Sequence, residues 1–142
     1  MTKLEAFETP ELAASSKNER LRPVAVDFDA SHKRATVLVL TPSGDRILRY
    51  CTLTQDGWVQ SDRDPASSAD LAWSSEFASN DPEPVLTFAK RVPQGAQGAT
   101  VRFAGKDRQV DAPHGYFIAS WWGPDAESVE DEQRPTVVKY HR

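Results

Sequence analysis

The chain has one cysteine, Cys51, among its 142 residues. An intramolecular disulfide is therefore excluded, and with it the class of small secreted domains that depend on disulfide bonds. No apolar run approaches the roughly 18 residues of a membrane span, and residues 1–5 contain no apolar signal sequence. The sequence therefore predicts a cytoplasmic protein without a membrane span.

Concentrated positive charge is also lacking. The formal net charge is -4, and the 17 basic residues are scattered along the chain. A nucleic-acid-binding protein normally carries a basic face or stripe, so we expect no nucleic-acid partner. The sequence also has no EF-hand loop, no paired-histidine motif and no cysteine ligand set, and we expect no cofactor.

The length and the ordinary hydrophobic content fit one domain with a real core. Residues 1–21 are predicted to form an arm or a short helix, because Thr9 and Pro10 make a typical helix start. Residues 22–142 are predicted to form a single β domain, since the hydrophobic period changes to two from Leu21 onward.

About eight strands are expected, joined mostly by Gly- and Asp-containing turns, and the first four should form a meander. The predicted strands cover residues 24–29, 36–40, 47–53, 58–60, 85–89, 100–103, 108–110, 116–122 and 136–140. No helices alternate with them, which favours an antiparallel β-sandwich of the immunoglobulin-like kind. A small closed β-barrel is the alternative.

Two segments differ from the strands in composition. Residues 62–84 are rich in serine and proline and exceed an ordinary connection, so this segment is the expected functional loop. Residues 125–132 are acidic and could dock a basic partner, although such loops are usually just solvated.

Oxygen and imidazole donors cluster in the first strand and the turn after it, at Asp27, Asp29 and His32. These groups could suit a divalent cation. The preferred interpretation is simpler: Asp27 and Asp29 form the solvent face of an alternating strand, and no metal site is expected.

Asp111, His114 and Ser120 are the one nearby set with the side chains of a hydrolase. Ser120 lies inside an apolar strand, however, and no G-x-S-x-G motif surrounds it. His114 before Gly115 is better explained as a turn residue. We therefore expect no catalytic residues.

Aromatic residues are the most suggestive feature, with four in the strand 116–122 and Trp58 at the start of another. Side chains alternate along a strand, so Trp121 and Trp122 must face opposite sides of the sheet. Tryptophan is enriched at protein interfaces and also stacks on sugar rings. The predicted binding residues are Trp58, His114, Tyr116, Trp121 and Trp122.

The segment 101–103 followed by 110–122 (VDAPHGYFIASWW) resembles the hairpin and aromatic strand of uncharacterised actinobacterial β-sandwich proteins. Some of those proteins are the outer portions of membrane-anchored chains. The resemblance covers a small part of the sequence and consists of turn and core residues. It implies a sandwich fold and carries over no functional residue.

The sequence thus predicts a non-enzymatic binding or accessory module with an unknown protein partner and an undetermined oligomeric state. A small-molecule or carbohydrate binder that uses exposed tryptophans is the first alternative. A hydrolase or metal-dependent enzyme is the second.

Overall fold

The structure is a computed structural model that describes residues 6–15, 20–29, 31–60, 71–74, 84–123 and 135–142. One helix, α1 (Pro10–Ser15), precedes the strands of the described part. The strands are β1 (Arg22–Phe28), β2 (Arg34–Leu40), β3 (Arg46–Thr54), β4 (Gly57–Gln60), β5 (Leu71–Ser74), β6 (Val85–Arg91), β7 (Gly98–Phe103), β8 (Lys106–Asp111), β9 (Tyr116–Trp122) and β10 (Thr136–His141).

The short helix begins where the sequence predicts. The Thr9 hydroxyl accepts a hydrogen bond from the Leu12 backbone N–H at 3.2 Å, which caps the first turn. Pro10 occupies the first helical position, where a missing N–H costs nothing. Ala13 and Ala14 are buried against the first sheet, so α1 covers that sheet.

The first sheet is the predicted meander, with antiparallel order β1-β2-β3-β4. Gly57, the first residue of β4, has a φ of 125°, and a Cβ there would lie 2.6 Å from the Phe7 carbonyl oxygen. Phe7 forms a bridge with Trp58 at this point. Only glycine allows this close approach of the two backbones.

The other strands form two antiparallel sheets of three, β5-β6-β9 and β10-β7-β8. The residues of β5 were expected to lie in a loop, and this expectation is wrong, because Leu71–Ser74 pairs with β6 along its outer edge. The sequence signal is weak there because an edge strand can be short. The remaining strands lie where the two-residue period predicts them.

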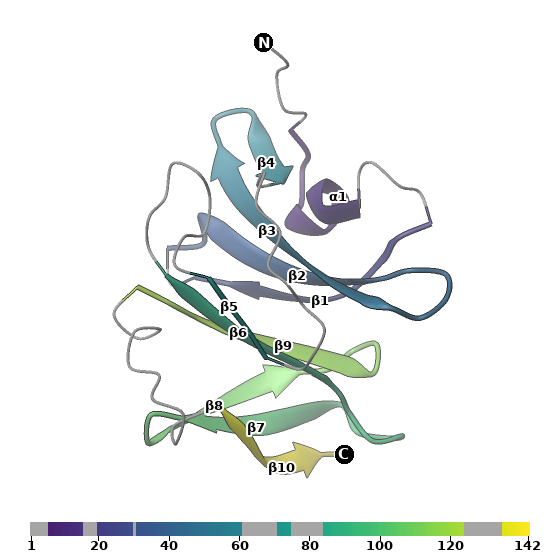
Figure 1. Cartoon of the computed structure of the whole chain (residues 1–142), viewed down its shortest axis with the longest axis vertical. Helices are drawn as coiled ribbons and strands as arrows, with labels where there is room; N and C mark the ends of the chain where they lie inside the picture. Colours follow the sequence, from purple (N-terminus) through teal and green to yellow (C-terminus); the bar gives the residue numbers. More distant parts are fainter. Residues whose placement is uncertain (1–5, 16–19, 30, 61–70, 75–83, 124–134) are drawn as a thin grey trace.

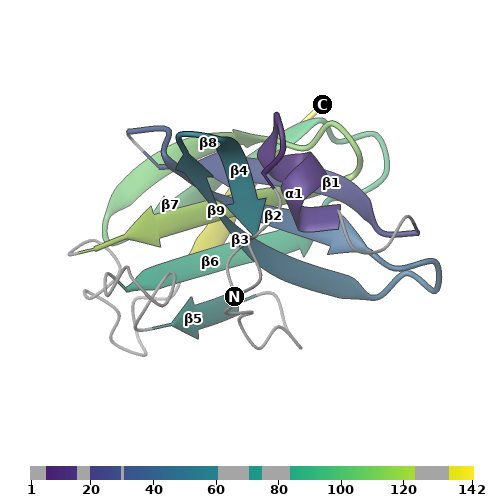
Figure 2. The same cartoon turned by 90° about the horizontal axis from the view of Figure 1, so that it is seen from above.

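The elements stack in layers (Figure 1). Helix α1 lies on the four-stranded sheet, as the view from above also shows (Figure 2). Below that sheet lies β5-β6-β9, and below this β10-β7-β8. Ile118 of β9 packs upward with Val24, whereas Phe117 packs downward with Val101. Strands β6 and β9 of the middle sheet are therefore largely buried.

The expectation of a mainly β, antiparallel fold is confirmed, and the stacked sheets are consistent with a sandwich. The closed-barrel alternative does not fit, since every sheet of the described strands has two outer strands. Within the described residues, the structure contains no helix of the length and hydropathy that crossing a bilayer requires.

Candidate functional site

The outer edge of β9 is the centre of the candidate site. Antiparallel pairs alternate between hydrogen-bonded and non-hydrogen-bonded residues. The Gly123 N–H donates to the Pro84 carbonyl at 2.9 Å, and the Val92 N–H donates to the Gly115 carbonyl at 2.9 Å. By alternation, the odd-numbered residues of β9 form the backbone hydrogen bonds to β6. The backbone groups of Ile118 and Ser120 therefore point away from β6, toward the outer edge.

Two side chains from other sheets hold the backbone of Ser120. Asp27 of β1 accepts the Ser120 N–H at 2.7 Å through Oδ2. Arg108 of β8 donates from Nη1 to the Ser120 carbonyl at 3.0 Å. Arg108 also forms an ion pair with Asp27. Together they bond the edge of β9 at Ser120 as a neighbouring strand would.

Burial sets the electrostatics of this ion pair. The Asp27 side chain is 10% exposed and that of Arg108 is 35% exposed. Loss of hydration raises the pKa of Asp27, and it outweighs the opposing hydrogen bond and charge of Arg108 and the Ser120 N–H. The pair occupies both backbone groups of Ser120, at one end of the outer edge of β9.

The Ser120 hydroxyl forms a second buried connection. It lies 2.6 Å from the Thr36 hydroxyl of β2 and 3.0 Å from the Thr87 hydroxyl of β6, within hydrogen-bond distance of both. All three side chains are at most 2% exposed. The first and middle sheets are thus joined by polar groups at a point surrounded by apolar side chains.

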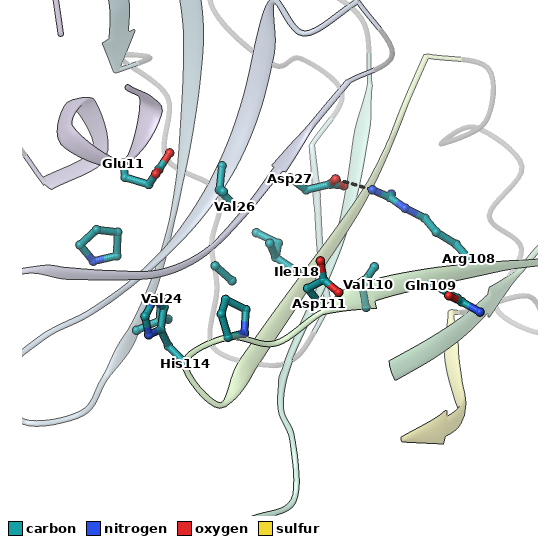
Figure 3. Close-up of a pocket in the computed structure, with 13 residues that line it drawn as sticks. Glu11, Val24, Val26, Asp27, Arg108, Gln109, Val110, Asp111, His114 and Ile118 are labelled. Carbon is teal, nitrogen blue, oxygen red and sulfur yellow. Dashed lines mark hydrogen bonds and ion pairs between the residues drawn. The ribbon is translucent and has the colours of Figure 1, made fainter. Parts of the chain in front are cut away.

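Beyond Ser120 the edge opens into a groove of about 610 Å³ (Figure 3). We call it the edge groove. Ile118 lies at its centre, the Asp27–Arg108 pair at one end, and Val24 and His114 toward the other. The edge groove is lined by Glu11, Pro23, Val24, Ala25, Val26, Asp27, Arg108, Gln109, Val110, Asp111, Pro113, His114 and Ile118.

Of the described strands, β1 and β8 are end strands of their sheets, and the unpaired edge of each also lies along this groove. The Asp29 N–H donates to the Arg34 carbonyl at 3.0 Å, so the odd-numbered residues at this end of β1 bond to β2. The backbone groups of Val26 therefore lie on the edge away from β2. In β8, the Ala112 N–H donates to Gln97 at 2.7 Å, which places the backbone of Gln109 on the edge away from β7. Among the described strands, three sheet edges meet here.

A second, more open hollow of about 1150 Å³ adjoins the groove. We call it the basic hollow. It shares Asp111, Pro113 and His114 with the edge groove. Its other lining residues are Arg22, Leu40, Arg91, Val92, Pro93, Gln94, Gly95, Ala96, Gln97, Ala112, Gly115 and Tyr116.

The structure brings together two of the five predicted binding residues. His114 is exposed and lines both hollows, and Tyr116 lines the basic hollow. Trp58 is 7% exposed and packs in the cluster beneath α1. Trp121 packs on Phe103 with ring centroids 4.7 Å apart.

Trp122 faces the opposite side of the sheet from Trp121, as the alternation predicts. It is partly buried beside Tyr50 and Val85, and the Arg34 guanidinium lies 5.9 Å from its ring centroid. None of the three tryptophans lines either hollow. In the described part of the chain Trp58 is buried, whereas Trp121 and Trp122 are half-buried and pack against their neighbours.

Asp27 and Asp29 do not form a solvent face, and that expectation is wrong. They are 8% and 5% exposed, because β9 packs on this side of β1 and the turn after β1 folds over Asp29. Asp29 accepts hydrogen bonds from Ser31, the Lys33 N–H and Arg34. His32 instead stacks on Phe28, with ring centroids 5.8 Å apart.

No group of three or more potential metal ligands occurs among the described side chains. The hydrolase set is not assembled either. His114 and Asp111 are exposed near the start of β9, whereas Ser120 is buried near its end. The expected functional loop falls largely on 61–70 and 75–83 and the acidic loop on 124–134, both outside the described residues.

Sequence reasoning missed Arg108 and Ile118. Their positions become meaningful only when β1, β8 and β9 are stacked, and Asp27 and Arg108 are 81 residues apart in the chain. One local signal existed: Asp27 is an acid between the apolar residues Val26 and Phe28. A scan against protein-family models finds no match, and searches of curated proteins and of solved structures find none either.

Proposed function

We propose that this chain is a non-enzymatic peptide-binding module that accepts an extended segment in the edge groove by strand addition. The observation that carries the proposal is the backbone of Ile118, which faces away from β6 and toward the edge groove and has no hydrogen-bond partner among the described residues, although the residue is only 3% exposed. An exposed strand edge provides a row of donors and acceptors that a guest strand satisfies.

The groove offers what a guest strand requires. Main-chain bonding is available at Ile118, with further backbone groups at Val26 and Gln109 on either side. Apolar side chains of Val24 and Val110 supply contact surface for alternate guest side chains. The Asp27–Arg108 pair limits the guest at Ser120, which fixes its register.

The first experiment is a display selection with random heptapeptides, followed by synthesis of an enriched peptide. Amide hydrogen exchange is then measured with and without that peptide. Because its N–H faces away from β6, the Ile118 amide is expected to exchange faster than the Ala119 amide in the free protein and to slow on binding, when a guest strand bonds it. The matched control is the Ala119 amide, which faces β6 and is already bonded in the free protein.

The second experiment uses the same peptide with alternate main-chain amides N-methylated, which keeps its side chains and removes its donors. Strand addition predicts loss of binding for one methylation pattern and retention for the complementary pattern. Equal binding of both patterns, or no change at the Ile118 amide, would contradict strand addition at this edge. Failure to enrich any peptide would count against the proposal as a whole.

The immunoglobulin-like connectivity expected from strand spacing stays a prediction. The tryptophan-platform alternative has no specific support in the described residues, since Trp58 is 7% exposed and neither hollow is lined by Trp121 or Trp122.

A further inference from the structure

The basic hollow continues the edge groove at the end away from the Asp27–Arg108 pair. The two share Asp111, Pro113 and His114. Tyr116, two residues before Ile118 on β9, lines the basic hollow. A segment that pairs with β9 at Ile118 and continues past Tyr116 therefore enters this hollow.

The hollow has a positive electrostatic character. Arg22 and Arg91 line it, both are exposed, and neither side chain has an ion-pair or hydrogen-bond partner among the described residues. Asp111 is the one acidic residue that lines it. Guanidinium groups favour carboxylate and phosphate partners, which they bind with paired N–H donors. The ligand chemistry that matches this end of the site is an anion.

Strand direction indicates which anion a peptide brings there. β9 runs from Tyr116 toward Trp122, so a guest antiparallel to it runs from Ser120 toward Tyr116. Its carboxyl end then arrives at the basic hollow. Antiparallel pairs outnumber parallel ones two- to three-fold. In addition, the blocked edge at Ser120 leaves this end as the open one.

We propose that the edge groove binds the C-terminal segment of its partner and that Arg22 and Arg91 receive the terminal carboxylate. The inference rests on the proposed function, because it requires a guest strand on β9. It adds the identity of the recognised group and the direction of the bound chain.

The test compares one enriched peptide as the free acid and as the C-terminal amide, in binding measured by calorimetry. Amidation is expected to weaken binding about 10- to 100-fold, the range for a lost hydrogen bond to a charged group. Arg22→Gln and Arg91→Gln should weaken binding of the acid and leave the amide unchanged. Arg102→Gln is the matched control, because Arg102 is an exposed arginine of β7 that lines neither hollow.

The outcomes separate the two proposals. If acid and amide bind equally while the Ile118 amide is still protected, strand addition stands and the carboxylate assignment fails. If binding instead follows an internal Asp or Glu of the peptide, terminal recognition is also overturned. If neither form binds and Ile118 is unaffected, the proposed function itself is contradicted.

Discussion

Asp27 of β1 and Arg108 of β8 form an ion pair across the edge of β9, although their sheets occupy different layers. The pair does more than join two charges. Each partner also bonds one backbone group of Ser120, so two side chains substitute for a neighbouring strand at that residue. The same pair marks the end of the edge groove.

The first prediction concerns the stability that this pair provides. Arg108→Ala leaves Asp27 buried without its cation and leaves the Ser120 carbonyl without a donor. Breaking a buried pair on one side costs about 3–5 kcal/mol, and partial exposure of Arg108 reduces our expectation to about 2–3 kcal/mol. Urea unfolding measures the change.

Arg102→Ala is the control for that experiment. Arg102 pairs with Asp107 in the same hairpin at 2.7 Å, but both side chains are about half exposed. Its replacement should leave the unfolding midpoint unchanged, since exposed pairs contribute little. A similar loss for both variants would mean that burial does not distinguish the two pairs.

The second prediction is the pH dependence of the Arg108→Ala defect. Burial raises the pKa of Asp27 above 3.8, so the folded state favours the protonated form more than the unfolded chain does. The stability it contributes is complete below 3.8 and is lost as pH rises through the folded-state pKa. Removing Arg108 raises that pKa further.

The defect of Arg108→Ala should therefore be largest near pH 7 and should shrink as pH falls toward 4. Unfolding curves of both proteins at several pH values measure this difference. A defect that stays constant or grows at acid pH would show that the charge of Asp27 is not the cause.

The third prediction has the opposite sign and concerns Asp29. Burial alone would raise the pKa of Asp29, but hydrogen bonds from Arg34, Ser31 and the Lys33 N–H outweigh it and lower the pKa below 3.8. Its stabilisation is present above 3.8 and is lost as pH falls through the folded-state value. Asp29→Asn should cost about 1–2 kcal/mol at pH 7, and the difference from the native chain should vanish in acid.

Much of this fold could be predicted locally, and the site could not. Alternating apolar residues and turns that contain Gly or Asp predicted β1 through β4, because each hairpin is closed by neighbours in sequence. The groove depends on which strands become outer strands and how the sheets stack. Asp27 illustrates the limit: alternation showed that it faces away from Val26, but not that β9 would cover it.

The aromatic residues show a different limit of sequence reasoning. The strand 116–122 was correctly placed, and its two tryptophans do face opposite sides. Their interface role was inferred from residue type and stays a prediction, because both tryptophans are half-buried in packing contacts on the two faces of the strand. The part of β9 that remains available for binding a guest strand is its outer backbone edge, and the pattern of side chains in the sequence does not show which strand edges are left unpaired.

The fourth prediction tests the buried hydroxyl cluster. The Ser120 hydroxyl is within hydrogen-bond distance of both the Thr36 and the Thr87 hydroxyls. The two threonine hydroxyls do not bond each other, so Ser120 is their shared partner. Ser120→Ala should therefore cost about 1–3 kcal/mol, and Thr36→Val less, about 1 kcal/mol. Urea unfolding of both variants gives the ranking. The reverse order would show that Ser120 is not the shared partner.

The last prediction concerns the turn between β7 and β8. Ala104 has a φ of 51° and Gly105 has a φ of 76°, the paired positive values of a type I′ turn. An alanine in this region is strained by about 1 kcal/mol, whereas asparagine tolerates it. Ala104→Asn should therefore stabilise the protein by about 0.5–1 kcal/mol, and Gly105→Ala should destabilise it. Thermal unfolding measures both changes. The same hairpin carries Arg108, and the stabilised turn should leave its ion pair with Asp27 intact. The loss of stability caused by Arg108→Ala should therefore be the same with and without Ala104→Asn.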